Sequence, residues 1–191
     1  MKILIVGLGV QGQKRKKILN ENHFCASVDI KNKNADFKSI EDVPLGKYDS
    51  VFVCTPDSAK LKILNYCIKH NKHALIEKPL IVNLESKIRI LEKKAKQLNL
   101  VFYSAYNHRF EPHFINIKKI IDSGALGKLY YCNIFYGNGT AKLVKKNKWR
   151  DKGLGVIQDL APHLMDTIKF WFKKDFKFKN SIKNKFENKA P

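Results

Sequence analysis

Three glycines near the start of the chain, Gly7, Gly9 and Gly12, have the GxGxxG spacing that suits binding of a dinucleotide pyrophosphate. Gly7 would allow a tight turn, Gly9 would let backbone amides approach the phosphates, and Gly12 would let a strand and a helix pack closely. Asp29 follows Gly9 by roughly 20 positions, where a carboxylate can accept hydrogen bonds from ribose hydroxyls. The alternative is a tight turn between a strand and a helix, with an aspartate on the surface.

Further candidates follow the predicted strands at their carboxyl ends, where ligands bind in open parallel sheets. Lys78 is the one that could do chemistry, because Pro79 restricts the backbone beside it and would direct its side chain toward a nicotinamide ring. A lysine there could donate a hydrogen bond to a substrate hydroxyl and lower that hydroxyl's pKa. The alternative is an ordinary solvated lysine. The predicted cofactor-binding residues are Gly7, Gly9, Val10, Gln11, Gly12, Asp29, Thr55, Pro56, Glu77 and Lys78.

Asp159 and His163 are at positions i and i+4 of a predicted helix, so their side chains share one face. Histidine titrates near neutral pH, which suits a general base that removes the proton of a hydroxyl. The carboxylate could orient the imidazole or hold a substrate hydroxyl. One alternative is an ion pair on the helix surface. The other is metal binding, for which the sequence offers no third ligand at a suitable spacing.

Short apolar segments that alternate with helical segments must position these residues. Strands are predicted over 3–6, 24–30, 50–54, 73–77 and 100–105. Helices are predicted over 11–19, 57–71 and 84–98. Strands and helices that alternate in this way predict an α/β fold with a Rossmann-type, mostly parallel sheet.

The pattern changes after Tyr106. Helices are predicted over 110–123 and 156–172, a strand over 128–136, a polar loop over 137–155, and another short strand over 176–182. One or two strands do not form a stable sheet by themselves. We therefore predict two domains, a Rossmann-type dinucleotide-binding domain over 1–106 and an incomplete α+β domain over 107–191.

The chain has 191 residues and a formal net charge of +20, which raises the question of a nucleic-acid partner. The lysines are spread along every predicted element, and this is typical of a solvated surface rather than a nucleic-acid footprint. No segment approaches the ~20 apolar residues of a membrane span. The cysteines have no CxxC spacing, which favours buried free thiols in a reducing compartment and predicts a cytoplasmic location. They are Cys25, Cys54, Cys67 and Cys132.

The motifs together resemble the Gfo/Idh/MocA family, named for glucose–fructose oxidoreductase, inositol dehydrogenase and a rhizopine-catabolism protein. Their order and spacing extend over about residues 1–172. They comprise the three glycines, Thr55-Pro56, Glu77-Lys78-Pro79, the run from Tyr106 to Phe110, Trp149-Arg150, and the pair Asp159 and His163. The segment from Phe186 to Pro191 is also similar to part of the nucleotide-sugar 3-dehydrogenase branch.

The resemblance implies an oxidoreductase that uses NAD, with NADP as the alternative, and acts on a sugar, cyclitol or nucleotide sugar. It implies a catalytic set of Lys78, Asp159 and His163. The substrate-binding residues that it implies are Asn107, Arg109, Trp149 and Arg150. Full-length family members are expected to form homo-oligomers, and no nucleic-acid or membrane partner is expected. The competing interpretation is a catalytically inactive dinucleotide-binding fragment or sensor.

The chain departs from the family pattern in three places. Leu154 interrupts a run of glycines before Asp159, and Lys60 stands where a histidine often follows the Thr-Pro pair. The chain is also shorter than members of the family, which typically continue through a large antiparallel sheet.

Overall fold

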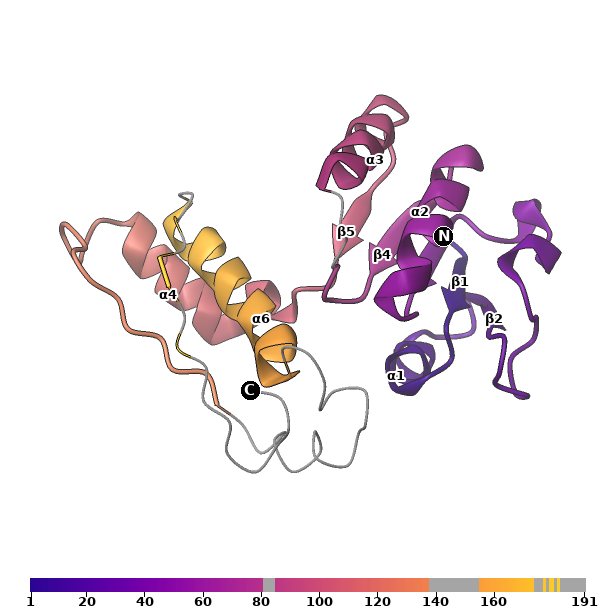
Figure 1. Cartoon of the computed structure of the whole chain (residues 1–191), viewed down its shortest axis with the longest axis horizontal. Coiled ribbons are helices and arrows are strands. Elements are labelled where there is room, and N and C mark those ends of the chain that lie inside the picture. Colours follow the sequence, from indigo (N-terminus) through magenta and orange to yellow (C-terminus); the bar gives the residue numbers. More distant parts are fainter. Residues whose placement is uncertain (81–84, 138–154, 174–176, 178, 181, 183–191) are drawn as a thin grey trace. The chain divides into compact units, whose positions relative to one another are not determined.

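The computed structural model describes residues 1–80, 85–137, 155–173, 177, 179–180 and 182 (Figure 1). The chain divides into two compact units, Met1–Ala105 and Tyr106–Pro191, here called the N-terminal and C-terminal units. Among the described helices, none is long and apolar enough to cross a membrane.

A five-stranded sheet with the order β2-β1-β3-β4-β5 forms the centre of the N-terminal unit, and all neighbouring strands are parallel. The α/β fold with a Rossmann-type parallel sheet is therefore confirmed. The strands are β1 (Ile3–Val6), β2 (Phe24–Val28), β3 (Ser50–Val53), β4 (His73–Ile76) and β5 (Phe102–Ser104). Between them lie the helices α1 (Val10–Ile18), α2 (Asp57–Lys69) and α3 (Glu85–Gln97), and the short 3₁₀ turns η1 (Ile40–Asp42) and η2 (Leu45–Lys47).

The core of this unit is built on the two central strands. Leu4 and Ile5 of β1 and Val51 and Val53 of β3 are completely buried. In a parallel sheet that is covered on both faces, the side chains on both sides of a strand are buried. All four residues of β1 are accordingly hydrophobic and buried. The rigid strands fix the positions of the loops that leave their carboxyl ends.

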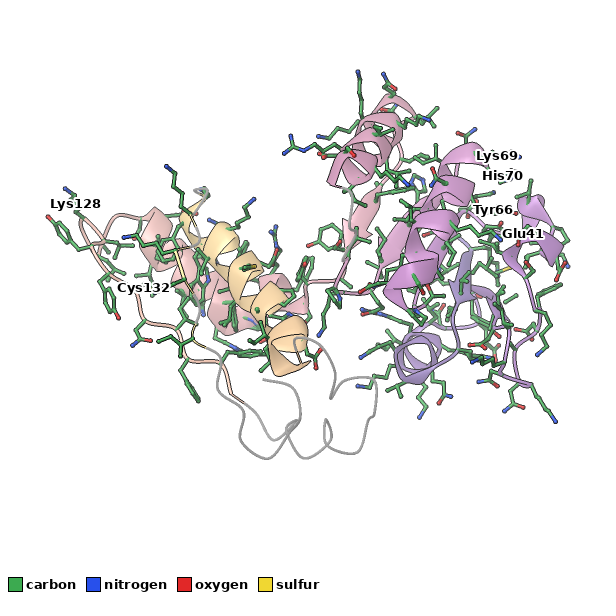
Figure 2. The ribbon with its side chains drawn as sticks, in the orientation of Figure 1. Glu41, Tyr66, Lys69, His70, Lys128 and Cys132 are labelled. Atoms are coloured by element: carbon green, nitrogen blue, oxygen red, sulfur yellow. The ribbon has the colours of Figure 1, made fainter. Side chains whose placement is uncertain are left out.

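Contacts from α2 hold the segment that follows β2. The Tyr66 hydroxyl donates to the carbonyl of Ile40 at 3.4 Å, and Lys62 forms an exposed ion pair with Glu41. Tyr66 of α2 and His70, the residue that follows this helix, also pack ring against ring, with their centroids 4.3 Å apart (Figure 2). The η1 turn is thereby anchored to α2.

The C-terminal unit has the 3₁₀ turn η3 (Asn107–Phe110) and the helices α4 (Pro112–Asp122) and α6 (Gly155–Phe172). The two helices lie side by side (Figure 1). Trp171 of α6 donates its indole N–H to the carbonyl of Phe114 of α4 at 3.0 Å, and their rings stack at 5.3 Å. These contacts fix how α6 packs on α4.

The predicted strand over 128–136 is wrong. The structure has an extended segment there without a ladder partner among the described residues, and alternating side chains cannot form a strand without a partner. Ile134 instead lines a groove together with Leu164 and Ile168 of α6. Cys132, labelled with Lys128 on this segment in Figure 2, is exposed, so the predicted burial of the thiols is wrong for Cys132. Cys67 is buried, and Cys25 and Cys54 are half-buried.

Two other predictions fall mainly outside the described residues. These are the polar loop over 137–155 and the short strand over 176–182. Residues 177, 179, 180 and 182 are described and are not in a strand.

Candidate functional site

The N-terminal unit places its glycine loop at the point where the strand order reverses. From β1 the sheet extends to β2 on one side and to β3, β4 and β5 on the other. In open parallel sheets the ligand crevice lies at such a switch point. Gly7 follows β1 there with a φ of +95°, and a Cβ on it would lie 2.7 Å from the Cys54 carbonyl and 3.0 Å from the Thr55 nitrogen. Only glycine allows this approach of the two loops.

Gly12 and Gly9 have different roles. A Cβ on Gly12 would lie 1.9 Å from the Gly7 carbonyl oxygen, so Gly12 is required for α1 to pack against the loop. A Cβ on Gly9 would meet nothing within 4 Å. Gly9 is therefore not required by packing inside the chain, and the open space beside it leaves room for a ligand to approach the backbone.

The N-terminus of α1 provides donors at the same place. The helix begins after Gly9 without a side-chain capping hydrogen bond and without an acidic residue in its first turn. Val10 and Gln11, both exposed, form the start of the helix. Its first backbone N–H groups and the helix dipole favour an anion there.

Thr55 adds an unsatisfied polar group at the end of β3. Its Oγ1 is buried and has no hydrogen-bond partner among the described residues. A buried hydroxyl without a partner is costly, and a polar ligand would satisfy it. Together with the free space at Gly9 and the uncapped helix, this fits a dinucleotide. Pro56, the next residue, is exposed and precedes α2.

Asp29 lies just beyond β2 and is bound by backbone amides. Its Oδ2 accepts from the Leu8 N–H at 2.7 Å, and its Oδ1 accepts from the Lys31 and Asn32 N–H groups at 2.8 and 2.9 Å. Partial burial raises the pKa of the carboxyl, but these three hydrogen bonds and Lys38 outweigh it and lower the pKa below 3.8. Asp29 therefore stays ionised and connects the end of β2 to the glycine loop.

Glu77 follows β4, and its carboxylate is engaged by α1. Arg15 donates from Nε to Glu77 Oε1 at 2.7 Å, and its terminal nitrogen lies 2.6 Å from the same oxygen. The side chain of Glu77 is 12% exposed, so this ion pair is well shielded from water. The ion pair connects the glycine-loop helix to the turn that carries Lys78.

Lys78 is half-buried, and the peptide bond between it and Pro79 is cis. Cys54 lies near Glu77 at the neighbouring strand end. Burial, with the Glu77 charge adding to it, raises the pKa of the Cys54 thiol to about 12. The thiol therefore stays protonated, and Lys78 rather than Cys54 is the candidate for chemistry.

In the C-terminal unit, α6 carries both Asp159 and His163. His163 is 8% exposed, and its ring lies against the rings of Tyr106, His108 and Tyr136, with centroids 6.1, 4.8 and 6.2 Å away. Asp159 is half-buried. Burial, with the charges of Glu111 and Asp159 adding to it, raises the pKa of Tyr136, so Asp159 is close enough to affect that phenol.

His108 lies in the middle of a hydrogen-bonded chain. Its Nδ1 is 2.8 Å from Glu111 Oε1, and its Nε2 is 3.2 Å from the Tyr136 hydroxyl. An ionised carboxylate can only accept, so Nδ1 donates its proton to Glu111, which leaves Nε2 facing the Tyr136 hydroxyl. The ring also stacks on Phe114 at 4.6 Å. The neighbour of His163 is therefore held in one orientation.

Two of the predicted substrate-binding residues make polar contacts inside the C-terminal unit. Asn107 donates to Glu111 Oε1 at 2.8 Å. Arg109 makes a bidentate contact with Asp166 of α6, from Nε and from a terminal nitrogen at 2.7 to 3.0 Å. Trp149 and Arg150 lie outside the described residues, so their predicted role is not located.

Several residues that shape these sites were not assigned a role from the sequence. Lys60 had a detectable signal, because it occupies a buried position of α2 together with Ile63, Leu64 and Cys67. A lysine on a buried helical stripe needs acceptors. Arg15 and the Glu111–His108–Tyr136 chain had no such signal, since their partners are distant in sequence. No group of three or more His, Cys, Asp or Glu side chains able to hold a metal was found within the described part of the chain.

Comparison with known proteins supports the same family for both units. Residues 1–105 match the family model described as "Oxidoreductase family, NAD-binding Rossmann fold", and residues 114–180 match the GFO/IDH/MocA C-terminal domain. The chain is 26% identical over 162 residues to glucose-6-phosphate 3-dehydrogenase of Bacillus subtilis, covering 78% of this chain and 46% of that protein. It is 30% identical over 86 residues to myo-inositol 2-dehydrogenase of Thermotoga maritima, covering 45% and 25%.

Solved structures show the same fold. Scyllo-inositol dehydrogenase from Lactobacillus casei, with bound NAD(H) and scyllo-inositol, superposes with a TM-score of 0.72 at 22% identity. The match covers 90% of this chain and 56% of that one. The chain spans between a quarter and a half of the length of the curated relatives that it matches first. With more than half of its residues matched by the Rossmann-fold model, this chain belongs to the Gfo/Idh/MocA family of oxidoreductases.

Proposed function

We propose that this chain carries the dinucleotide site and part of the substrate site of an NAD-dependent dehydrogenase. The reaction is the interconversion of a secondary alcohol and a ketone on a sugar, cyclitol or nucleotide sugar. The observation that supports it most strongly is the open space at Gly9, which lies between the uncapped start of α1 and a loop closed by Gly7 and Gly12. The named relatives act on inositols and glucose 6-phosphate, which supports the substrate class.

Each part of the cofactor site has a role in this proposal. The first amides of α1 bind the pyrophosphate, and Thr55 Oγ1 donates to or accepts from the cofactor. The Asp29 carboxylate has lone pairs left for a ribose hydroxyl and would repel a phosphate on it, so NAD is preferred to NADP. When bound, NAD supplies the hydride acceptor.

Three residues are proposed to act on the substrate. Lys78 donates a hydrogen bond to the reacting hydroxyl and lowers its pKa. His163 takes the proton, and Asp159 on the same face of α6 orients the imidazole or a substrate hydroxyl. A buried ring with fixed aromatic neighbours suits this role, because the position of a general base determines its efficiency.

The cofactor site is tested with two glycine variants. Gly9→Ala adds a methyl group where nothing lies within 4 Å, so the melting temperature should not fall, while the affinity for NAD should drop at least tenfold. Gly46→Ala is the matched control, because its added methyl group also meets nothing within 4 Å and Gly46 is in η2. Calorimetric titration with NAD and with NADP measures both variants and the wild type. Equal NAD affinity in the two variants, or tighter NADP binding by the wild type, would contradict the cofactor assignment.

Turnover is tested in the same preparation by following NADH formation with a panel of inositols, sugars and nucleotide sugars. His163→Ala should lower kcat by about 10²–10⁴-fold and leave NAD affinity unchanged. NAD binding without turnover on any substrate would favour the second candidate, a binding-only fragment or sensor. That candidate is supported by Arg109 and Asn107, whose polar groups contact Asp166 and Glu111 inside the unit.

A further inference from the structure

Lys60 is the most deeply buried charged residue among those the structure describes. It lies on α2 with 2% of its surface exposed, and its ammonium donates to Asp57 Oδ1 at 2.7 Å. It also donates to the carbonyl oxygen of Glu77 at 2.6 Å and to the carbonyl oxygen of Pro79. A lysine ammonium has three donors, so all of them are used.

The two carbonyl groups stand on either side of Lys78. One belongs to the peptide unit that enters Lys78, and the other to the peptide unit that leaves Pro79. A single buried ammonium therefore joins both ends of the Lys78-Pro79 dipeptide to α2. The Glu77 side chain is held separately by Arg15. The backbone on which the Lys78 side chain stands is thus fixed from two helices.

We propose that Lys60 is the positioning residue for Lys78, setting the backbone of the turn from which Lys78 acts. The effect of Lys60 on catalysis rests on the function proposed above for Lys78. The effect of Lys60 on the backbone of the turn does not rest on that function, because it comes from hydrogen bonds inside the N-terminal unit.

An ion pair with Asp57 does not account for this arrangement. The Asp57 side chain is 26% exposed and is one turn away on the same helix, so a surface pair would satisfy it without burying an ammonium. Burying a charge is costly unless every donor is satisfied. The carbonyls of the Lys78 turn supply the two further acceptors, which explains why Lys60 points toward this turn and not toward water.

The first measurement uses the wild-type chain alone. A buried ammonium with three acceptors exchanges its protons slowly and gives an observable nitrogen–proton NMR signal. We expect scalar couplings across the hydrogen bonds from Lys60 Nζ to the carbonyl carbons of Glu77 and Pro79. A rapidly exchanging, uncoupled ammonium would overturn the proposal without any variant.

The second measurement compares Lys60→Met with Lys72→Met. Lys72 is the matched control, because it also donates to two backbone carbonyls of the same unit, those of Leu45 and Tyr48, at 2.8 and 2.6 Å. Both variants should lose thermal stability. Only Lys60→Met should increase the motion of the amides of Glu77, Lys78 and Leu80 in NMR relaxation. If the motion of these amides increased equally in the two variants, or did not increase in Lys60→Met, the proposal would be overturned.

Kinetics then separates positioning from stability. Misplacing a reacting group by about 1 Å can cost on the order of 10²-fold, so Lys60→Met should lower kcat by that factor and leave KM for NAD unchanged. Lys72→Met should keep the wild-type kcat. Loss of kcat in both variants, or in neither, would show that Lys60 does not position the turn for catalysis. A wild-type chain without turnover would count against the proposed function, while the NMR measurements would still decide the position of Lys60.

Discussion

At the scale of single residues, carboxylates hold the loops of the cofactor site. Asp29 accepts hydrogen bonds from three backbone amides. Asp36 accepts hydrogen bonds from the N–H and the hydroxyl of Ser27, both at 2.7 Å. The hydrogen bonds from Ser27 lower the pKa of Asp36 despite partial burial, and the amides lower that of Asp29. Both groups therefore stabilise the folded state when they are ionised.

Stability should fall in acid for this reason. With folded-state pKa values below 3.8, both carboxylates stabilise the fold above pH 3.8, and their contribution is lost as the pH falls through the lower folded-state values. In Asp29→Asn the unfolding free energy at pH 7 should drop by about 1–3 kcal/mol, since the buried N–H of Leu8 loses the carboxylate oxygen that accepts its hydrogen bond. Its decline between pH 5 and pH 2 should also be shallower than in the wild type. Urea unfolding at several pH values measures this, and parallel pH profiles for the two proteins would contradict the role of Asp29.

At the scale of elements, the C-terminal unit is joined by side chains across helices and turns. Arg109 of η3 makes a bidentate contact with Asp166 of α6, whose side chain is 9% exposed. A planar guanidinium can donate two parallel hydrogen bonds to one carboxylate, and an ammonium cannot. The Arg109 contact therefore fixes η3, which carries His108, against the helix that carries His163.

Arg109→Lys should for this reason destabilise the unit even without substrate. Removing hydrogen bonds to a charged, mostly buried partner should cost about 1–3 kcal/mol. Lys119→Ala, an exposed change on α4, should stay within about 0.5 kcal/mol of the wild type. Thermal unfolding followed by tryptophan fluorescence reports on this unit through Trp171. If Arg109→Lys affected only substrate affinity, Arg109 would be a substrate residue with no structural role.

At the scale of the whole molecule, burial is distributed unevenly. Every hydrophobic residue that is buried in the described part of the chain lies between Ile3 and Ala95. In the C-terminal unit the buried side chains among those described are His163 and Thr167. Large aromatic side chains are exposed on its extended segment, with Tyr130, Tyr131 and Phe135 at 84%, 83% and 90%.

Protection from hydrogen exchange should follow this distribution. Amides of β1, β3 and β4 should exchange through global unfolding, while those of α4 and α6 should exchange faster, because few apolar contacts hold these helices. Exchange measured by mass spectrometry on the intact chain gives both rates. Strong protection across residues 112–122 and 155–172 in a monomer would show that the C-terminal unit is stable by itself.

The order of strands and helices in the N-terminal unit was determined by the sequence, because buried parallel strands are continuous apolar runs and Gly7 and Gly12 leave one packing solution. The strand predicted over 128–136 was wrong because a strand needs a partner, and the local alternation of side chains does not show whether the fold supplies one. The contacts that hold the candidate residues were decided by tertiary structure. Glu77 pairs with Arg15 and Lys60 reaches both sides of Lys78 because the parallel sheet brings α1, α2 and the end of β4 together. Such partners lie 17 to 62 positions apart in the chain, and local spacing carries no information about them.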